Sequence, residues 1–251
     1  MSQLLLAVDT SGKNGSVALA RAMPGQREIQ VLEVVPLVGG AFSAQLVPQI
    51  AALLANHGYS KSDLGAFAVA SGPGSFTGLR VGLAAMKALA EALQKPMVAI
   101  SVLEAVAYSG ASQGASQGTS QGTGRGRVLA ILDAGRGDIY VGDYELNPQV
   151  HMQARMHNER LLSREEFIAE AQVEAKVLEA KRKAVVTPDA VLAEKIQSAG
   201  IQIELIEYPN SGVLARLGWE HLQRGETVRP EELEANYLRH SDAEIFSKPA
   251  P

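Results

Sequence analysis

Residues 71–79, Ser-Gly-Pro-Gly-Ser-Phe-Thr-Gly-Leu, decide the fold because they join a short apolar run to a long segment with helical apolar spacing. The run, residues 66–70, predicts a strand, and residues 78–94 predict a helix. The glycines between them can adopt positive φ angles, and the proline fixes its own φ. The sequence therefore predicts a tight strand-to-helix turn whose backbone lies close to another group.

This turn admits two interpretations. N–H groups at a helix start attract anions, so a loop of this kind can hold a phosphate. A turn that only packs a helix on a sheet would look the same, and the loop has neither the Lys-Ser/Thr ending of a P-loop nor the dinucleotide-binding spacing. The residues of this signature loop are Gly72, Pro73, Gly74, Ser75, Phe76 and Thr77.

The composition bounds the class of protein. A chain of 251 residues can form one large or two small domains. It has no cysteine, which excludes disulfides and thiolate chemistry and suits a cytoplasmic protein. The first apolar run is interrupted by Asp9, so we expect no signal peptide, and no segment is apolar enough to predict a membrane span. The formal net charge of −4 argues against direct RNA binding as the main role.

The first half alternates strands and helices after three opening strands. Helical spacing over 43–57 predicts a helix, and Ser101 with Glu104 predicts a capping box that opens a short one. The predicted strands are residues 4–8, 15–20, 29–35, 66–70 and 97–100.

Residues 110–126 differ in kind, because Ser-Gln-Gly occurs in them three times with only small or polar residues between. Such a segment buries too little apolar surface to offset its ordering entropy, so we expect a flexible loop. We interpret it as an inert insertion; a role in gating a ligand is the alternative.

The opening pattern then returns. Residues 128–133 and 138–143 repeat the strand, glycine turn and strand of residues 4–20, and Asp133 falls where Asp9 stood. This predicts a duplicated βββαβαβα-like unit, although two similar hairpins can also arise by chance.

The rest of the second half continues the alternation. A capping box formed by Ser163 and Glu166 opens a predicted helix that runs to Lys181, and Thr187 is the predicted N-cap of the next. The remaining predicted elements are strands at 184–186 and 201–205 and a helix at 213–223. The charged stretch 174–183 is interpreted as a solvated helix face, with a partner surface as the alternative.

Three separated stretches, in order, carry a family resemblance. They are the signature loop continued to Gly82, Ala130-Ile-Leu-Asp-Ala134 with Ile139-Tyr140, and Glu234-Ala-Asn-Tyr-Leu-Arg239. Together they resemble the TsaB (YeaZ) family of the actin/hexokinase/Hsp70 superfamily. The resemblance implies an α/β protein with a duplicated actin-like ATPase-type fold and a reduced second lobe. We expect a first lobe at 1–109, the insertion at 110–126, and a second lobe at 127–251 whose last helix can pack back on the first.

The resemblance also implies a function. Members of the family support TsaD, the transferase that makes N6-threonylcarbamoyladenosine at position 37 of tRNAs reading codons that start with A. The expected role is thus a non-catalytic scaffold subunit. Its expected partners are TsaD, the ATPase TsaE, and a second copy of itself when alone, with tRNA bound only through the complex. We expect ATP or ADP and a metal ion only in the partner subunits or at a shared interface.

No metal site of its own is expected. TsaD holds a metal with a His-x-x-x-His pair on its first long helix, and the corresponding residues 41–50 contain no histidine. Phe42 stands near the position where family members often keep one histidine.

Acidic hairpin turns leave a second hypothesis open. Kinases of the superfamily use such turns near magnesium, so the rival hypothesis for the whole chain is a free-standing small-molecule kinase or ATPase. For the acidic residues themselves, the alternative is a structural role in which the Asp side chain hydrogen-bonds the turn that follows it. The candidate remnant of a nucleotide site is Asp9, Thr10, Ser11, Gly12 and Asp133.

The predicted helix pair, 43–57 and 78–94, is the expected docking surface. Its apolar arc is wider than one sheet needs, although burial within its own lobe would explain it equally well. The expected partner-binding residues are Leu46, Ile50, Leu53, Leu54, Gly78, Leu79, Gly82, Leu83, Ala85, Met86 and Leu89.

Overall fold

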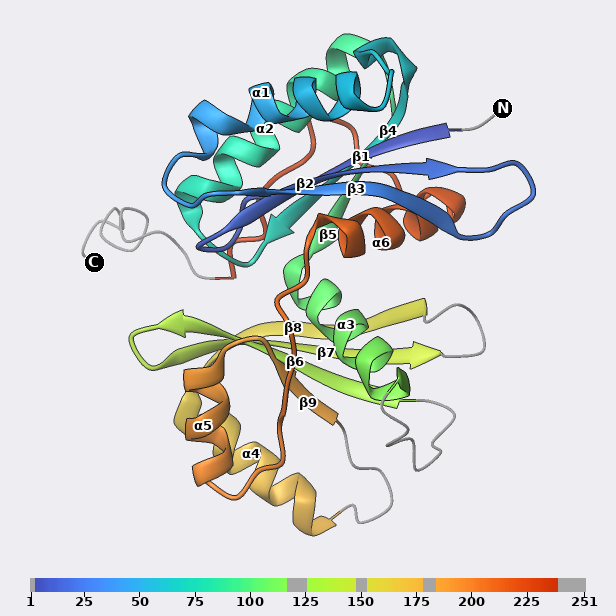
Figure 1. The fold of residues 1–251 in the computed structure, drawn as a ribbon. Helices are drawn as coiled ribbons and strands as arrows, with labels where there is room; N and C mark the ends of the chain where they lie inside the picture. Colours follow the sequence, from blue (N-terminus) through green and yellow to red (C-terminus); the bar gives the residue numbers. More distant parts are fainter. Residues whose placement is uncertain (1–2, 117–125, 148–152, 178–183, 239–251) are drawn as a thin grey trace. The chain divides into compact units, whose positions relative to one another are not determined.

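A computed structural model describes residues 3–116, 126–147, 153–177 and 184–238 (Figure 1). The chain forms two compact units, each built from two separate stretches of sequence. The first unit holds Met1–Ala105 and Tyr208–Ala235, and the second holds Val106–Glu207 and Asn236–Pro251. Among the helices of the described residues, none is long and apolar enough to cross a membrane.

The first unit is built on a five-stranded sheet of order β3-β2-β1-β4-β5. β1 (Gln3–Asp9), β2 (Gly15–Ala22) and β3 (Ile29–Leu37) pair antiparallel, whereas β4 (Leu64–Gly72) and β5 (Met97–Ser101) continue the sheet parallel to β1. β1 lies in the centre, and its continuous apolar sequence is typical of a strand buried on both faces.

Helices cover both faces of this sheet (Figure 1). α1 (Phe42–Asn56) and α2 (Phe76–Leu93) share a core with Leu6 and Val8, while α6 (Ser211–Gln223) packs on the other face near Leu5. Successive side chains of a strand point to opposite faces, so β1 supplies both cores. A short 3-10 helix, η1 (Lys61–Asp63), leads into β4.

The second unit repeats this sheet. Its five strands have the order β10-β9-β6-β7-β8, which read in reverse matches the order of the first sheet strand by strand. Three antiparallel strands again precede two parallel ones. The strands are β6 (Gly126–Gly135), β7 (Asp138–Asn147), β8 (Gln153–Ser163), β9 (Ala184–Thr187) and β10 (Glu204–Leu205), and the helices are α4 (Arg164–Val177) and α5 (Ala190–Ser198). A further helix, α3 (Val102–Ser116), begins in the first unit and continues into the second from Val106 onward. The predicted α/β fold with duplicated lobes is confirmed.

Two strands differ from their predictions. β8 was not predicted, because its sequence, Gln-Ala-Arg-Met-His-Asn-Glu-Arg-Leu-Leu-Ser, lacks regular alternation of apolar and polar residues. It lies at the edge of the sheet, where such a sequence is tolerated. The strand predicted at 201–205 is reduced to Glu204–Leu205.

The predicted flexible segment begins later than expected. α3 continues to Ser116, so a loop from residue 110 onward is wrong over 110–116. Gly110 lies at a close contact within this extension, since a Cβ there would lie 2.7 Å from Cγ1 of Val186. The glycine therefore lets the helix approach β9 closely. Residues 117–125 of the expected loop lie outside the described residues.

The caps of three helices test the local predictions. The capping box of α4 is confirmed, because the Ser163 N–H donates to Glu166 at 2.9 Å and the Glu166 N–H donates to Ser163 Oγ at 3.2 Å. At the start of α3, Ser101 Oγ accepts from the Leu103 N–H at 3.2 Å, while the Glu104 carboxylate contacts His221. Asp189, not Thr187, caps α5 by accepting from Leu192 N–H at 3.0 Å. The predicted helix end at Lys181 lies outside the described residues.

Candidate functional site

The turn after β1 is closed by its own side chains. Asp9 is 2% exposed, and its carboxylate accepts hydrogen bonds from the Ser11 N–H at 2.8 Å and the Ser11 hydroxyl at 2.6 Å. Burial raises the pKa of Asp9, although these two hydrogen bonds act in the opposite direction. The carboxylate of Asp9 is therefore bonded within the turn that it begins.

The signature loop packs directly on this turn. The Thr10 hydroxyl donates to the Gly78 carbonyl at 2.7 Å, and the Ser75 N–H donates to the Ser11 carbonyl at 2.7 Å. Ser75 also caps α2, because its hydroxyl accepts from the Gly78 N–H at 3.3 Å. The backbone of the loop thus lies against the chain's own first turn.

Three glycines make this approach sterically feasible. A Cβ on Gly78 would lie 2.1 Å from the Thr10 carbonyl oxygen, and one on Gly82 would lie 2.4 Å from the Thr10 hydroxyl. A Cβ on Gly74 would lie 2.5 Å from the Ser11 carbonyl oxygen. Of the two interpretations of the loop, these contacts favour a turn that packs a helix on a sheet.

Tyr208, which sequence reasoning missed, completes the cluster. Its hydroxyl lies 3.1 Å from Ser11 Oγ, and a Cβ on Gly12 would lie 3.3 Å from the same hydroxyl. The residue as a whole is 41% exposed, but its hydroxyl end is enclosed. Burial of that hydroxyl, with a smaller contribution from the Asp9 charge, raises the pKa of Tyr208. No sequence signal connects two residues that are 197 positions apart.

Asp133 has a different environment from Asp9. It lies in the second unit near the end of β6, where it is exposed and its carboxylate accepts from the Gly135 N–H at 3.2 Å. Of the candidate nucleotide-site residues, the structure brings together Asp9 to Gly12 within the first unit. Their polar groups contact the chain itself.

The expected partner-binding residues lie mostly inside the first unit. All of them are buried except Ala85 and Leu89, which are half-buried against the same core. A residue packed in its own core cannot present its side chain to a partner. Phe42 is also part of this core and contacts Gly15, where a Cβ would lie 2.9 Å from the ring.

The solvent side of the helix pair has an unusual composition. Val47 is 62% exposed, and the other exposed residues around it are small or uncharged. α1 contains no charged residue in its 15 positions. This outer face, which we call the alanine face, consists of Ala44, Val47, Pro48, Ala51, Ala52 and Ala55 of α1 with Ala84 and Ala88 of α2.

The residues of the alanine face are regularly spaced along their helices. Its α1 residues recur at intervals of four, and Ala84 and Ala88 have the same spacing on α2, so each set lies on one side of its helix. Sequence reasoning missed this surface because it followed the apolar stripe of each helix, which the structure buries in the first unit. The available signal was the lack of charge along α1.

Part of the signature loop is exposed to solvent. Phe76 is 39% exposed, and the Arg80 guanidinium lies over its ring at 3.7 Å. Among the described residues, no three His, Asp or Glu side chains gather in a way that could hold a metal ion.

The comparisons agree with this fold along most of the chain. The family model described as TsaD, tRNA N6-adenosine threonylcarbamoyltransferase, matches residues 34–245. Among solved structures, YeaZ from Pseudomonas aeruginosa is 25% identical with a TM-score of 0.69, covering 94% of this chain and 99% of that one.

Curated relatives match a shorter stretch. The tRNA threonylcarbamoyladenosine biosynthesis proteins TsaB of Bacillus subtilis and Escherichia coli are each 32% identical over 141 residues, which is 56% of this chain. The alignments cover 55% and 54% of those proteins, so the chain spans about half the length of the curated relatives it matches. Because the family model covers well over half of the residues, the chain belongs to the TsaD family and is similar to its TsaB (YeaZ) relatives.

Proposed function

We propose that this chain is a non-catalytic subunit of a complex that makes N6-threonylcarbamoyladenosine at position 37 of tRNA, and that it binds and supports a TsaD-type transferase. The names of the TsaB relatives and the match to the TsaD family model support this pathway. The scaffold role rests on the structure of the helix pair.

The alanine face is the observation that carries the proposal. Soluble proteins usually place charged residues on the outer face of a surface helix, and the described α1 has none. Burying uncharged, small side chains avoids the desolvation penalty that buried charges bring, and it lets the backbone of another helix come near. The face is therefore suited to contact with helices of another chain.

The expected occupant is the corresponding helix pair of a TsaD-type subunit. A partner with a homologous fold presents helices in a matching arrangement, so the two pairs can form a four-helix contact. The same geometry allows two copies of this chain to pair through identical surfaces when the partner is missing.

The proposed locations of tRNA, nucleotide and metal ion are argued from the net charge of the chain and from the hydrogen bonds of the turn after β1. With a formal net charge of −4, this subunit is proposed to meet tRNA only through the complex. Nucleotide and metal ion are assigned to TsaD, to a TsaE-type ATPase or to a shared interface, because the polar groups of Asp9 to Ser11 are bonded within this chain.

Co-purification with a TsaD-type protein tests the docking surface. Ala51→Glu on α1 or Ala88→Glu on α2 places a carboxylate in the proposed contact, and we expect each to lower the yield of complex at least tenfold, since burying an unpaired charge costs about 3–5 kcal/mol. Both positions are exposed, so the variants should fold.

Ala169→Glu provides the matched control. It makes the same change at an exposed position of α4 in the second unit, and it should leave the complex intact. Circular dichroism checks that all three variants are folded. Full binding by folded Ala51→Glu and Ala88→Glu would place the interface elsewhere.

A further inference from the structure

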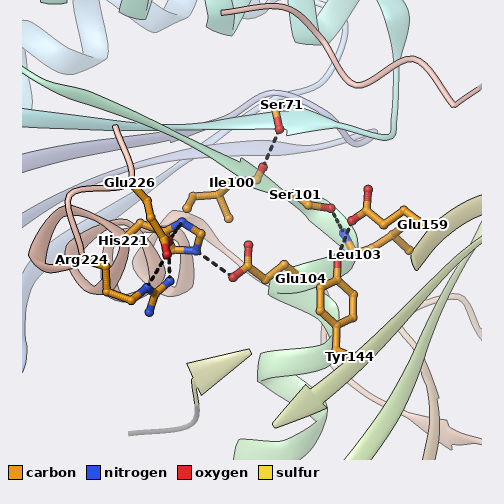
Figure 2. Close-up of polar contacts among 10 residues, drawn as sticks. All are labelled: Ser71, Ile100, Ser101, Leu103, Glu104, Tyr144, Glu159, His221, Arg224 and Glu226. Atoms are coloured by element: carbon orange, nitrogen blue, oxygen red, sulfur yellow. Dashed lines mark hydrogen bonds and ion pairs between the residues drawn. The ribbon is translucent and has the colours of Figure 1, made fainter. Parts of the chain in front are cut away.

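The end of α6 carries a histidine whose two ring nitrogens each face a carboxylate (Figure 2). His221 Nε2 lies 2.8 Å from Glu104 Oε1, and Nδ1 lies 3.0 Å from Glu226 Oε2. The Arg224 guanidinium makes two hydrogen bonds to the same Glu226 carboxylate, at 2.9 and 2.8 Å. We call Glu104, His221, Arg224 and Glu226 the His221 cluster; all four belong to the first unit.

The geometry of the His221 cluster requires a proton. A neutral imidazole has one N–H donor and one lone pair, so only a doubly protonated ring can donate to both carboxylates. If the ring is neutral, the lone pair of one ring nitrogen faces a carboxylate and the two repel each other. Only a proton on Glu104 would avoid this repulsion. The side chains of His221 and Glu104 are only 17% and 10% exposed, so water screens such a repulsion weakly.

The cluster lies at the start of a segment that returns to the sheet. We call residues 225–235 the return segment. Its Val228 N–H donates to the Met97 carbonyl of β5 at 2.9 Å, and its Leu233 is 3% exposed in the core of the first unit. Because Glu226 opens this segment, the His221 cluster connects it to α6 and to the start of α3.

Other charges around the ring act in the same direction. Glu28 lies in the connection between β2 and β3, and Glu220 is next to His221 on α6. The pKa of Glu220 is raised to about 7, chiefly by burial; the charges of Arg224 and His221 act to lower it, and those of Glu104 and Glu28 act to raise it. Four carboxylates thus face two cationic groups, and every proton lost on raising the pH adds negative charge here.

We propose that the His221 cluster is a proton-dependent fastening of the return segment to the first unit, closed while both ring nitrogens carry a proton and weakened as the pH rises. The inference does not depend on the proposed function. Its sign follows from linkage: a folded state that binds more protons than the unfolded chain is favoured at low pH and loses that stability as the pH rises.

Hydrogen–deuterium exchange of the return segment at pH 6 and pH 8.5 tests this inference. After correction for the intrinsic exchange rates, we expect the opening equilibrium constant of residues 225–235 to rise roughly tenfold at the higher pH, the factor that one linked proton produces over one pH unit. Trp219, the single tryptophan, lies two residues before His221 and donates to the Arg27 carbonyl at 2.9 Å, so its fluorescence should change over the same pH range.

Glu104→Gln separates proton linkage from simple loss of a contact. The amide of a glutamine can donate to Nε2 of a neutral ring while Nδ1–H donates to Glu226, so the variant should keep the segment closed at both pH values. The pH effect on exchange should then nearly disappear. The isosteric change also keeps the variant foldable, which His221→Gln need not be.

His57→Gln is the matched control, because His57 pairs with Glu33 through Nε2 at 2.8 Å at the end of α1. It should leave the pH effect on the return segment unchanged. Equal exchange of the wild-type segment at the two pH values would overturn the inference, and so would a full pH effect in Glu104→Gln.

Discussion

The distance between α2 and the turn after β1 is set by single glycines. The sequence predicts that the signature loop approaches something closely, and the structure identifies the target as Thr10 and Ser11. That target could not be predicted from the sequence, because a glycine indicates that another group lies close to the backbone but not which atoms belong to that group. Tyr208 illustrates the same limit, since its partner Ser11 is remote in sequence.

Gly78→Ala should destabilise the protein. Its Cβ would lie 2.1 Å from the Thr10 carbonyl oxygen, a backbone atom that cannot move without shifting β1. Overpacking of this kind costs about 1–3 kcal/mol, and sometimes more. The midpoint of urea unfolding measures the change.

Gly65→Ala is the control for that substitution. A Cβ there would lie 2.6 Å from Cγ of Gln3, a side chain that can turn aside at the loss of its Nε2 hydrogen bond to the Gly65 carbonyl. We expect a much smaller effect than for Gly78→Ala. If both variants unfolded at the wild-type midpoint, the close approach of α2 would not limit stability.

At the scale of helices and strands, periodicity indicated which residues are buried but not what buries them. Leu46, Ile50 and Leu83 have the spacing of an apolar face, and the structure packs that face on the sheet of their own unit. A partner chain would produce the same spacing. The absence of charge on the opposite side of α1 is the feature on which the proposed docking surface rests.

The strands were predicted best where they are buried. β1, β2 and β4 have continuous or alternating apolar residues, so their existence follows from the sequence alone. β8 is an edge strand in which polar residues dominate, and β10 pairs through two residues only. Their positions depend on the neighbouring strand, which a local pattern does not contain.

α6 is held to the first sheet by two buried serines. The Ser211 hydroxyl donates to the Ser16 carbonyl at 2.6 Å, and the Ser211 N–H donates to Ser16 Oγ at 2.8 Å. Ser211→Ala should destabilise the protein by about 1–3 kcal/mol, because it removes the hydroxyl that donates to the buried Ser16 carbonyl, while the backbone N–H of residue 211 keeps its bond to Ser16 Oγ. The exposed Ser62→Ala should change stability by less than about 0.5 kcal/mol. Equal unfolding midpoints for the two variants would contradict this role of Ser211.

At the scale of the whole molecule, the duplicated sheets invite comparison with enzymes that use such a fold to hold a nucleotide. We expect the pure protein to release no phosphate from Mg-ATP above background, because the Asp9 carboxylate and the Thr10 hydroxyl are already bonded within the chain. A phosphate-release assay without added partners measures this. Turnover that disappears in Asp9→Asn or Asp133→Asn would instead establish a kinase or ATPase of the same superfamily.

The discontinuity of the first unit has a consequence for how the chain is made. Its sheet is complete once residue 105 has been synthesised, but α6 and the return segment come from Tyr208–Ala235, about a hundred residues later. At roughly 5–20 residues per second, the ribosome needs on the order of 5–20 s to produce them. During that time the apolar face of β1 and β4 that contacts Gly218 has no cover. The nascent chain therefore exposes an apolar surface that is prone to aggregation while the second unit is being translated. We expect chaperone binding to matter most during this interval.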